Sequence, residues 1–97
     1  MEIASTILRH LGGNIFIAMT GAKNFVSDGN SLRFKVSKCK NGINYIVITL
    51  AADDTYTVCF NKIIKQTNIK EIIRHDSVYV DNLQSVFTQE TGLYTRI

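Results

Sequence analysis

The chain has 97 residues, of which 45% are hydrophobic and 20% are charged, a composition typical of one globular domain rather than of a disordered chain. Its net charge of +3 permits a nucleic acid or an acidic protein as the partner but requires neither. No apolar run approaches the length of a membrane span, and the start lacks the basic region of a signal peptide, so we expect a cytoplasmic protein with no membrane partner.

The first predicted element is a helix from Glu2 to Leu11. Its apolar residues repeat at helical spacing on one face: Ile3, Ile7, Leu8 and Leu11. Gly12 and Gly13 would end this helix, because glycine readily takes the left-handed conformation that closes a helix. From Asn14 to Met19 we predict a strand, since apolar residues occupy both of its faces and a Thr-Gly pair interrupts it.

An amphipathic strand is predicted next, from Ser31 to Lys38. It alternates apolar and polar residues, with one face made of Leu32, Phe34 and Val36. Hairpin signals lie on both sides of it, Asp28-Gly29 before and Asn41-Gly42 after. The sequence therefore predicts that this strand pairs with a neighbour on each side.

The strand that follows, from Ile43 to Leu50, is apolar on both faces, so we place it at the centre of the sheet. A turn at Asp53-Asp54 leads to a returning strand from Thr55 to about Ile64. The stretch from Gln66 to Val80 fits either an edge strand or a helix that starts with a capping box. We favour the strand, because β-branched isoleucines and short antiparallel connections suit it.

The last predicted element is a helix from Asp81 to Glu90. Asp81 has the side chain of an N-cap, and Gln84 three residues later completes a variant of the capping box. The expected buried stripe consists of Leu83, Val86 and Phe87. Gly92 is the expected C-terminal cap.

These elements predict a single α+β domain over residues 1–97, an antiparallel meander of four to five strands flanked by an N-terminal and a C-terminal helix. We expect both helices to pack on one face of the sheet. The other face then either serves as a partner surface or homodimer interface, or is buried by strong curling of the sheet itself.

The residue types that carry catalysis are too scattered to predict an enzyme or a cofactor. A zinc site needs four ligands, usually in closely spaced pairs, whereas His10, His75, Cys39 and Cys59 are far apart in the chain. Cys39 lies between two lysines that favour a thiolate, but no histidine adjoins it. The Asp53-Asp54 pair fits a turn that satisfies backbone donors better than a pair of catalytic carboxylates.

The charge pattern of the first half of the chain predicts a binding surface instead. Between Arg9 and Lys40 there are six basic residues, and the only acid is Asp28. The candidate contact residues for a nucleic acid or an acidic protein are Lys23, Arg33, Lys35, Lys38 and Lys40. The alternative is a solvated strand face whose charges serve solubility.

Three segments, MTGAKNF from Met19, NGINY from Asn41 and FTQETGLYT from Phe87, resemble a family of small proteins encoded by bacteriophages and prophages. The resemblance spans nearly the whole chain and implies no catalytic residue. It implies a protein made in the cytoplasm of a bacterial host. Small proteins in that setting bind host machinery, so we expect a non-enzymatic partner of a host protein or ribonucleoprotein complex, with an anti-CRISPR protein as the sharpest version. The alternative is a small nucleic-acid-binding protein that serves phage replication or regulation.

Overall fold

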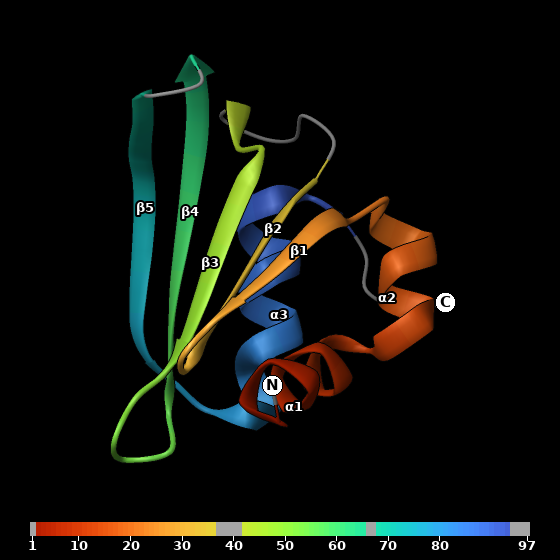
Figure 1. Cartoon of the computed structure of the whole chain (residues 1–97), viewed down its shortest axis with the longest axis vertical. Helices are drawn as coiled ribbons and strands as arrows, with labels where there is room; N and C mark the ends of the chain where they lie inside the picture. The colour runs from red at the N-terminus through yellow and green to blue at the C-terminus, as the bar shows by residue number, and fades with distance from the viewer. Residues whose placement is uncertain (1, 37–41, 66–67, 94–97) are drawn as a thin grey trace.

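The computed structural model describes residues 2–36, 42–65 and 68–93. Within these ranges the chain forms three helices and five strands (Figure 1): α1 Glu2–Leu11, α2 Gly13–Thr20, β1 Lys23–Asp28, β2 Ser31–Lys35, β3 Tyr45–Leu50, β4 Tyr56–Lys65, β5 Asn68–Val78 and α3 Val80–Thr91. The strands form one antiparallel sheet in the order β1-β2-β3-β4-β5. This arrangement confirms the predicted α+β fold and the central place of β3.

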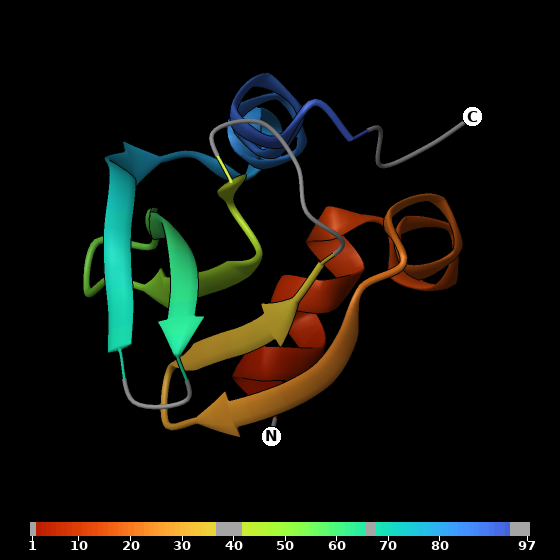
Figure 2. The same cartoon turned by 90° about the horizontal axis from the view of Figure 1, so that it is seen from above.

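The three helices lie on the same side of the sheet, which curls around them (Figures 1 and 2). The core lies between the two layers, where Phe34 of β2, Ile46 and Ile48 of β3, Phe60 of β4 and Phe87 of α3 are fully buried. On the opposite face, Val47 of β3 is only half-buried. The helices therefore cover one face, as expected, and leave the other to solvent. Among the described residues, none of the helices has the length and hydropathy that a membrane crossing requires.

The strand predicted from Asn14 to Met19 is wrong, because this segment forms helix α2. Phe16 and Thr20, four residues apart, are both buried on one face of the helix. Ile15, next to Phe16 in the sequence, is 52% exposed. The ring of Phe16 packs edge-on against Phe34 at 5.6 Å and Phe87 at 5.1 Å. A short segment with apolar residues on every side has no periodicity that distinguishes a helix from a strand. Its secondary structure is therefore determined by the residues against which it packs.

Helices α2 and α3 end in the same way, with a buried threonine followed by a left-handed glycine. The Thr20 hydroxyl donates to the carbonyl of Phe16 at 2.7 Å and accepts from the Ala22 N–H at 3.2 Å. Thr91 does the same with the Phe87 carbonyl and the Leu93 N–H. Gly21 and Gly92 have φ of 69° and 76°, a conformation that favours glycine. The segments MTGAKNF and FTQETGLYT thus each contain one of these helix C-caps.

The predicted hairpins can be compared with the observed register. Asp28 pairs with Ser31 around the Gly29-Asn30 turn, and Leu32 and Phe34 of β2 face the core. The stretch for which helix and strand were both open is a strand, β5, at one edge of the sheet. Residues 37–41, which include the end of the strand predicted from Ser31 to Lys38 and the start of the Asn41-Gly42 turn, lie outside the described residues.

Helix α3 begins one residue earlier than predicted, and its N-cap was predicted wrongly. Tyr79 precedes the helix, and no side chain caps its first turn. Gln84 donates to the carbonyl of Leu11 at 2.8 Å, which ties α3 to the end of α1 instead of closing a capping box. Leu83 and Phe87 are fully buried, and Gly92 ends the helix as expected.

Candidate functional site: the basic end of the sheet

The register of the sheet brings two pairs of lysines to one end of it. Lys23 at the start of β1 lies directly opposite Lys35 at the end of β2. Lys62 near the end of β4 lies directly opposite Lys70 near the start of β5. Antiparallel pairing puts these strand ends together, at the top of Figure 1 and facing the viewer in Figure 2. We call these four residues the basic end.

Acidic residues gather at the opposite end of the sheet. Asp28 ends β1, Asp53 and Asp54 lie in the connection from β3 to β4, and Asp76 lies near the end of β5. The charges of the sheet are therefore separated along the strand direction. A surface with such a potential attracts an anionic partner to one end in preference to the other.

The two arginines of the sheet differ from these lysines, because each pairs with an acid. Arg33 binds Asp28, and Arg74 binds Asp76 at 3.1 Å. A hydrogen bond with Tyr45 and the charge of Asp28 raise the pKa of Arg33 above its ordinary value. Arg33 is thus engaged inside the sheet, and its charge is offset by a neighbour.

No acid in the described part of the chain forms an ion pair with a lysine of the basic end. Glu71, the nearest acid in register, has its carboxylate beside the thiol of Cys59 instead. Like charges directly opposite each other destabilise a strand pair, by an amount on the order of a few tenths of a kcal/mol at an exposed site. The two lysine pairs therefore lower the stability of the fold, and no ion pair with a described acid compensates for this loss.

A shallow cavity of about 200 Å³ adjoins the first lysine pair. It is lined by Lys23, Lys35, Val36, Asn44 and Ile63. The Asn44 carboxamide oxygen accepts the Ile63 N–H at 2.8 Å, so this side chain is held in place. The volume is below the range of sites for drug-sized ligands and cofactors. It suits a single phosphate or carboxylate group that belongs to a larger partner.

The structure brings together only part of the predicted set. Lys23 and Lys35 are exposed neighbours, Arg33 is half-buried and paired, and Lys38 and Lys40 lie outside the described residues. Lys62 and Lys70 were missed, because the second half of the chain has a balanced charge. Their signal is the β4–β5 register, which the sequence does not reveal while the state of β5 is open.

Other residues with reactive side chains have structural roles. Burial raises the pKa of the Cys59 thiol, which opposes thiolate formation. The Asp53 carboxylate accepts the Thr55 hydroxyl at 2.6 Å and the Thr55 N–H at 3.2 Å, and these bonds lower its pKa. Asp53 therefore satisfies a turn, as the sequence indicated. Across the described ranges, no group of three or more His, Cys, Asp and Glu is placed to hold a metal ion.

Two histidines join distant elements. His75 of β5 bonds Glu90 of α3 at 2.8 Å, and His10 of α1 bonds the Tyr56 hydroxyl of β4 at 2.9 Å. Both contacts tie a helix to the sheet and are separated from the basic end. The basic end is thus the feature of the described chain that is best suited to contact a partner.

The chain matches no protein-family model, and no curated protein and no solved structure is significantly similar to it.

Proposed function

We propose that this chain is a non-enzymatic binding protein of the kind that bacteriophages and prophages encode, and that its basic end contacts the phosphates of a host ribonucleoprotein. The observation that carries the proposal is a pair of exposed lysines, Lys23 and Lys35, which lie directly opposite each other in the sheet. No acid among the described residues forms an ion pair with either of them. A partner's phosphate would supply the missing negative charge. The most specific version of this proposal is an anti-CRISPR protein, whose target is a host defence complex that contains RNA.

Lysine suits this role because it is a compact point charge on a flexible stem, which can follow a phosphate backbone without reading a base. The cavity beside Lys23 and Lys35 has room for one such group. Lys62 and Lys70 extend the positive potential across the same end of the sheet. Lys38 and Lys40, which the sequence adds to the candidate contact residues, lie outside the described residues, so their part in the contact stays a prediction.

The second candidate function is a sequence-tolerant nucleic-acid-binding protein that serves phage replication or regulation. The same lysines favour it, since phosphate contacts alone give binding without sequence preference. The two functions differ in whether free nucleic acid suffices. Binding to naked RNA or DNA with a steep dependence on salt supports the second candidate, whereas binding only to the assembled complex supports the first.

The test compares K23Q/K35Q with R9Q/R74Q, two variants that lose the same net charge at different places. Affinity is measured for a purified host ribonucleoprotein captured by the wild-type protein, and for free RNA and DNA, over a salt series. We expect K23Q/K35Q to bind at least tenfold more weakly, with a shallower salt slope, and R9Q/R74Q to bind nearly as wild type. K23Q/K35Q should also be at least as stable as wild type, because a repulsion is removed. Equal losses in both variants would contradict a localised site.

A further inference from the structure

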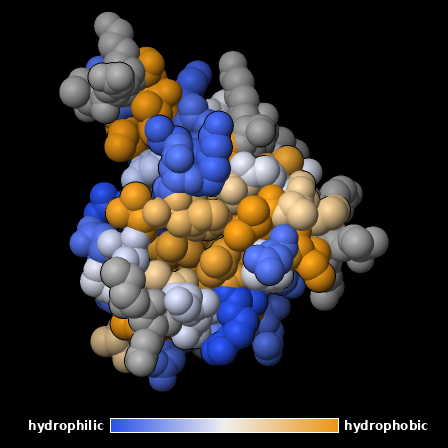
Figure 3. Space-filling view, turned by 45° about the vertical axis from the view of Figure 1, so that its right-hand side comes forward, coloured by the Kyte–Doolittle hydropathy of each residue, from blue (hydrophilic) through white to orange (hydrophobic). Residues whose placement is uncertain are grey.

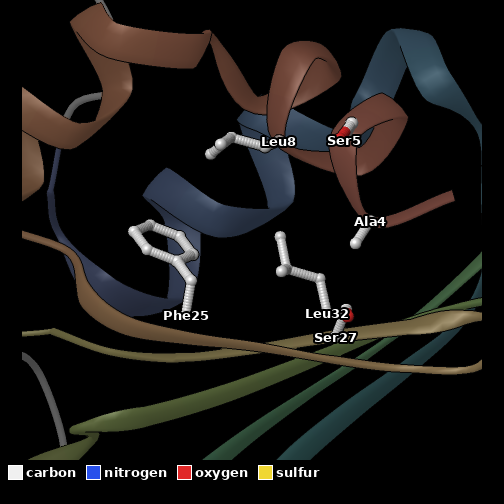
Figure 4. A pocket seen from close by; sticks show the side chains of 6 residues that line it. All are labelled: Ala4, Ser5, Leu8, Phe25, Ser27 and Leu32. Carbon is white, nitrogen blue, oxygen red and sulfur yellow. The ribbon is translucent and has the colours of Figure 1, made fainter. Parts of the chain in front are cut away.

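Strand β1 has a free edge beside an apolar groove. It ends the sheet, so no described strand pairs with its second edge. A cavity of about 360 Å³ opens between α1 and this strand, and Figure 4 shows its lining: Ala4, Ser5, Leu8, Phe25, Ser27 and Leu32. Val26 on the other face of β1 is 54% exposed. Figure 3 shows an apolar area framed by hydrophilic groups on the side of the molecule that carries α1, α2 and β1.

A register shift in β1 decides which residues share a face. Val26 is opposite Arg33 and Lys23 is opposite Lys35, so three residue steps along β1 cover the same distance as two steps along β2. Asp28 is opposite Ser31, two steps from Val26 in the other direction. Lys23 and Asp28 are therefore equally far from Val26 along the ladder, on the same face of the sheet.

We propose that two copies of this chain associate through their β1 strands, antiparallel, with Val26 facing Val26 across a two-fold axis. In this register Lys23 of each copy lies directly opposite Asp28 of the other. The strand is thus complementary in charge to its own copy, at both ends of the pairing. The two exposed valines meet at the centre, where cross-strand apolar contacts contribute to strand association.

The proposed pairing supplies what each copy lacks at this edge. Lys23, which faces Lys35 in its own chain, comes next to the carboxylate of the second copy's Asp28, which also binds Arg33 of that copy. On the helix-covered face, the second copy's Phe25 comes next to Ser27, at the rim of the apolar groove. Backbone hydrogen bonds along the edge add affinity, as in other complexes formed by strand addition. The pairing engages Lys23, which also belongs to the basic end, and leaves Lys35 and Lys70 exposed and Lys62 half-buried. A cross-link at Val26 reports the pairing alone, because it changes no residue of the basic end.

Strand β5, at the other edge, fits a second copy less well. Its pairing with β4 has three register irregularities, against one in β1. Irregular and charged edges resist the addition of another strand. Pairing of β1 with β5 of another copy would also be head-to-tail and would build a ring or an open filament, whereas β1 with β1 closes as a two-fold dimer.

The first experiment uses a symmetric disulfide. Residues directly opposite in an antiparallel pair have Cα atoms about 4.5 to 5.5 Å apart, within disulfide range. V26C in a C39S background should therefore form a covalent dimer rapidly under mild oxidation. The matched control is I69C in the same background, because Ile69 on β5 is 55% exposed against 54% for Val26. Cross-linking of V26C that is no faster than that of I69C would overturn the proposal.

The second experiment is a charge swap followed by sedimentation velocity over a range of concentrations. K23E and D28K should each raise the dimer dissociation constant at least tenfold, since each places like charges opposite across the axis. The double variant K23E/D28K should recover most of the loss, because the opposite charges are restored in reverse order. Thermal melts report whether each variant is folded. A wild-type chain that stays monomeric at every concentration, or a dimer whose dissociation constant does not change with the single substitutions, would refute the pairing.

Discussion

Replacement of Phe16 by alanine tests the assignment of α2 and the core that depends on it. Phe16 is fully buried and makes edge-on ring contacts with Phe34 and Phe87 at 5.6 and 5.1 Å. Removal of a buried phenylalanine side chain costs about 3 to 5 kcal/mol, which includes the cavity that is left. Each aromatic pair adds about 0.5 to 1.5 kcal/mol beyond burial, so we expect the upper part of that range.

A loss of about 4 kcal/mol is a large share of the 5 to 15 kcal/mol that stabilises a typical domain. Taking a urea m-value of about 2 kcal/mol/M, the unfolding midpoint should fall by roughly 2 M with little change in m. Urea denaturation followed by circular dichroism measures both quantities. Phe16→Leu should lose less, because the remaining side chain fills most of the cavity.

The matched control is Ile15→Ala, one residue away. Ile15 is 52% exposed in α2, and alanine has the higher helix propensity, so stability should change by less than about 0.5 kcal/mol. Similar losses at both positions, or a loss below about 1 kcal/mol for Phe16→Ala, would refute the helical packing of this segment.

Two further predictions concern buried hydroxyl groups. Thr91→Val should cost about 1 to 3 kcal/mol in urea denaturation, because the Leu93 N–H loses its acceptor, while Thr91→Ser should lose far less; equal losses would exclude the hydroxyl as the cause. Burial raises the pKa of Tyr56, so its contribution to stability is present below the ordinary tyrosine pKa near 10 and is lost as pH rises through the folded-state value. Thermal melts from about pH 8 to 12 should therefore fall more steeply for wild type than for Tyr56→Phe, and parallel curves would contradict this linkage.

Much of the fold follows from local patterns. The alternation in β2, the apolar run of β3 and the turn residues at Asp28-Gly29 and Asp53-Asp54 predict strands and connections correctly, because side-chain direction and turn conformation depend on neighbours in sequence. The glycine C-cap of α3 belongs to the same class. For Gln66 to Val80 the pattern left two states open; the preferred one, a strand, is observed over Asn68–Val78, whereas Val80 belongs to α3.

The candidate site was predictable only in part. Lys23 and Lys35 could be placed on one surface because a hairpin joins their strands. Lys62 and Lys70 could not be added, since their approach depends on the register between β4 and β5, which has three irregularities. The pairing of Arg33 with Asp28 also required the register, which turned one expected contact residue into a neutralised one.

By itself, the sequence determined the order of most elements, the position of the central strand and the excess of positive charge in the first half of the chain. The tertiary structure alone decided that residues 13–20 are helical, because Phe16 needed partners from β2 and α3 to fix its surroundings. It also decided which lysines stand together, because charges distant in sequence meet only through the register of paired strands. Local conformational preference acts over a few residues, whereas packing and register are set by the whole domain.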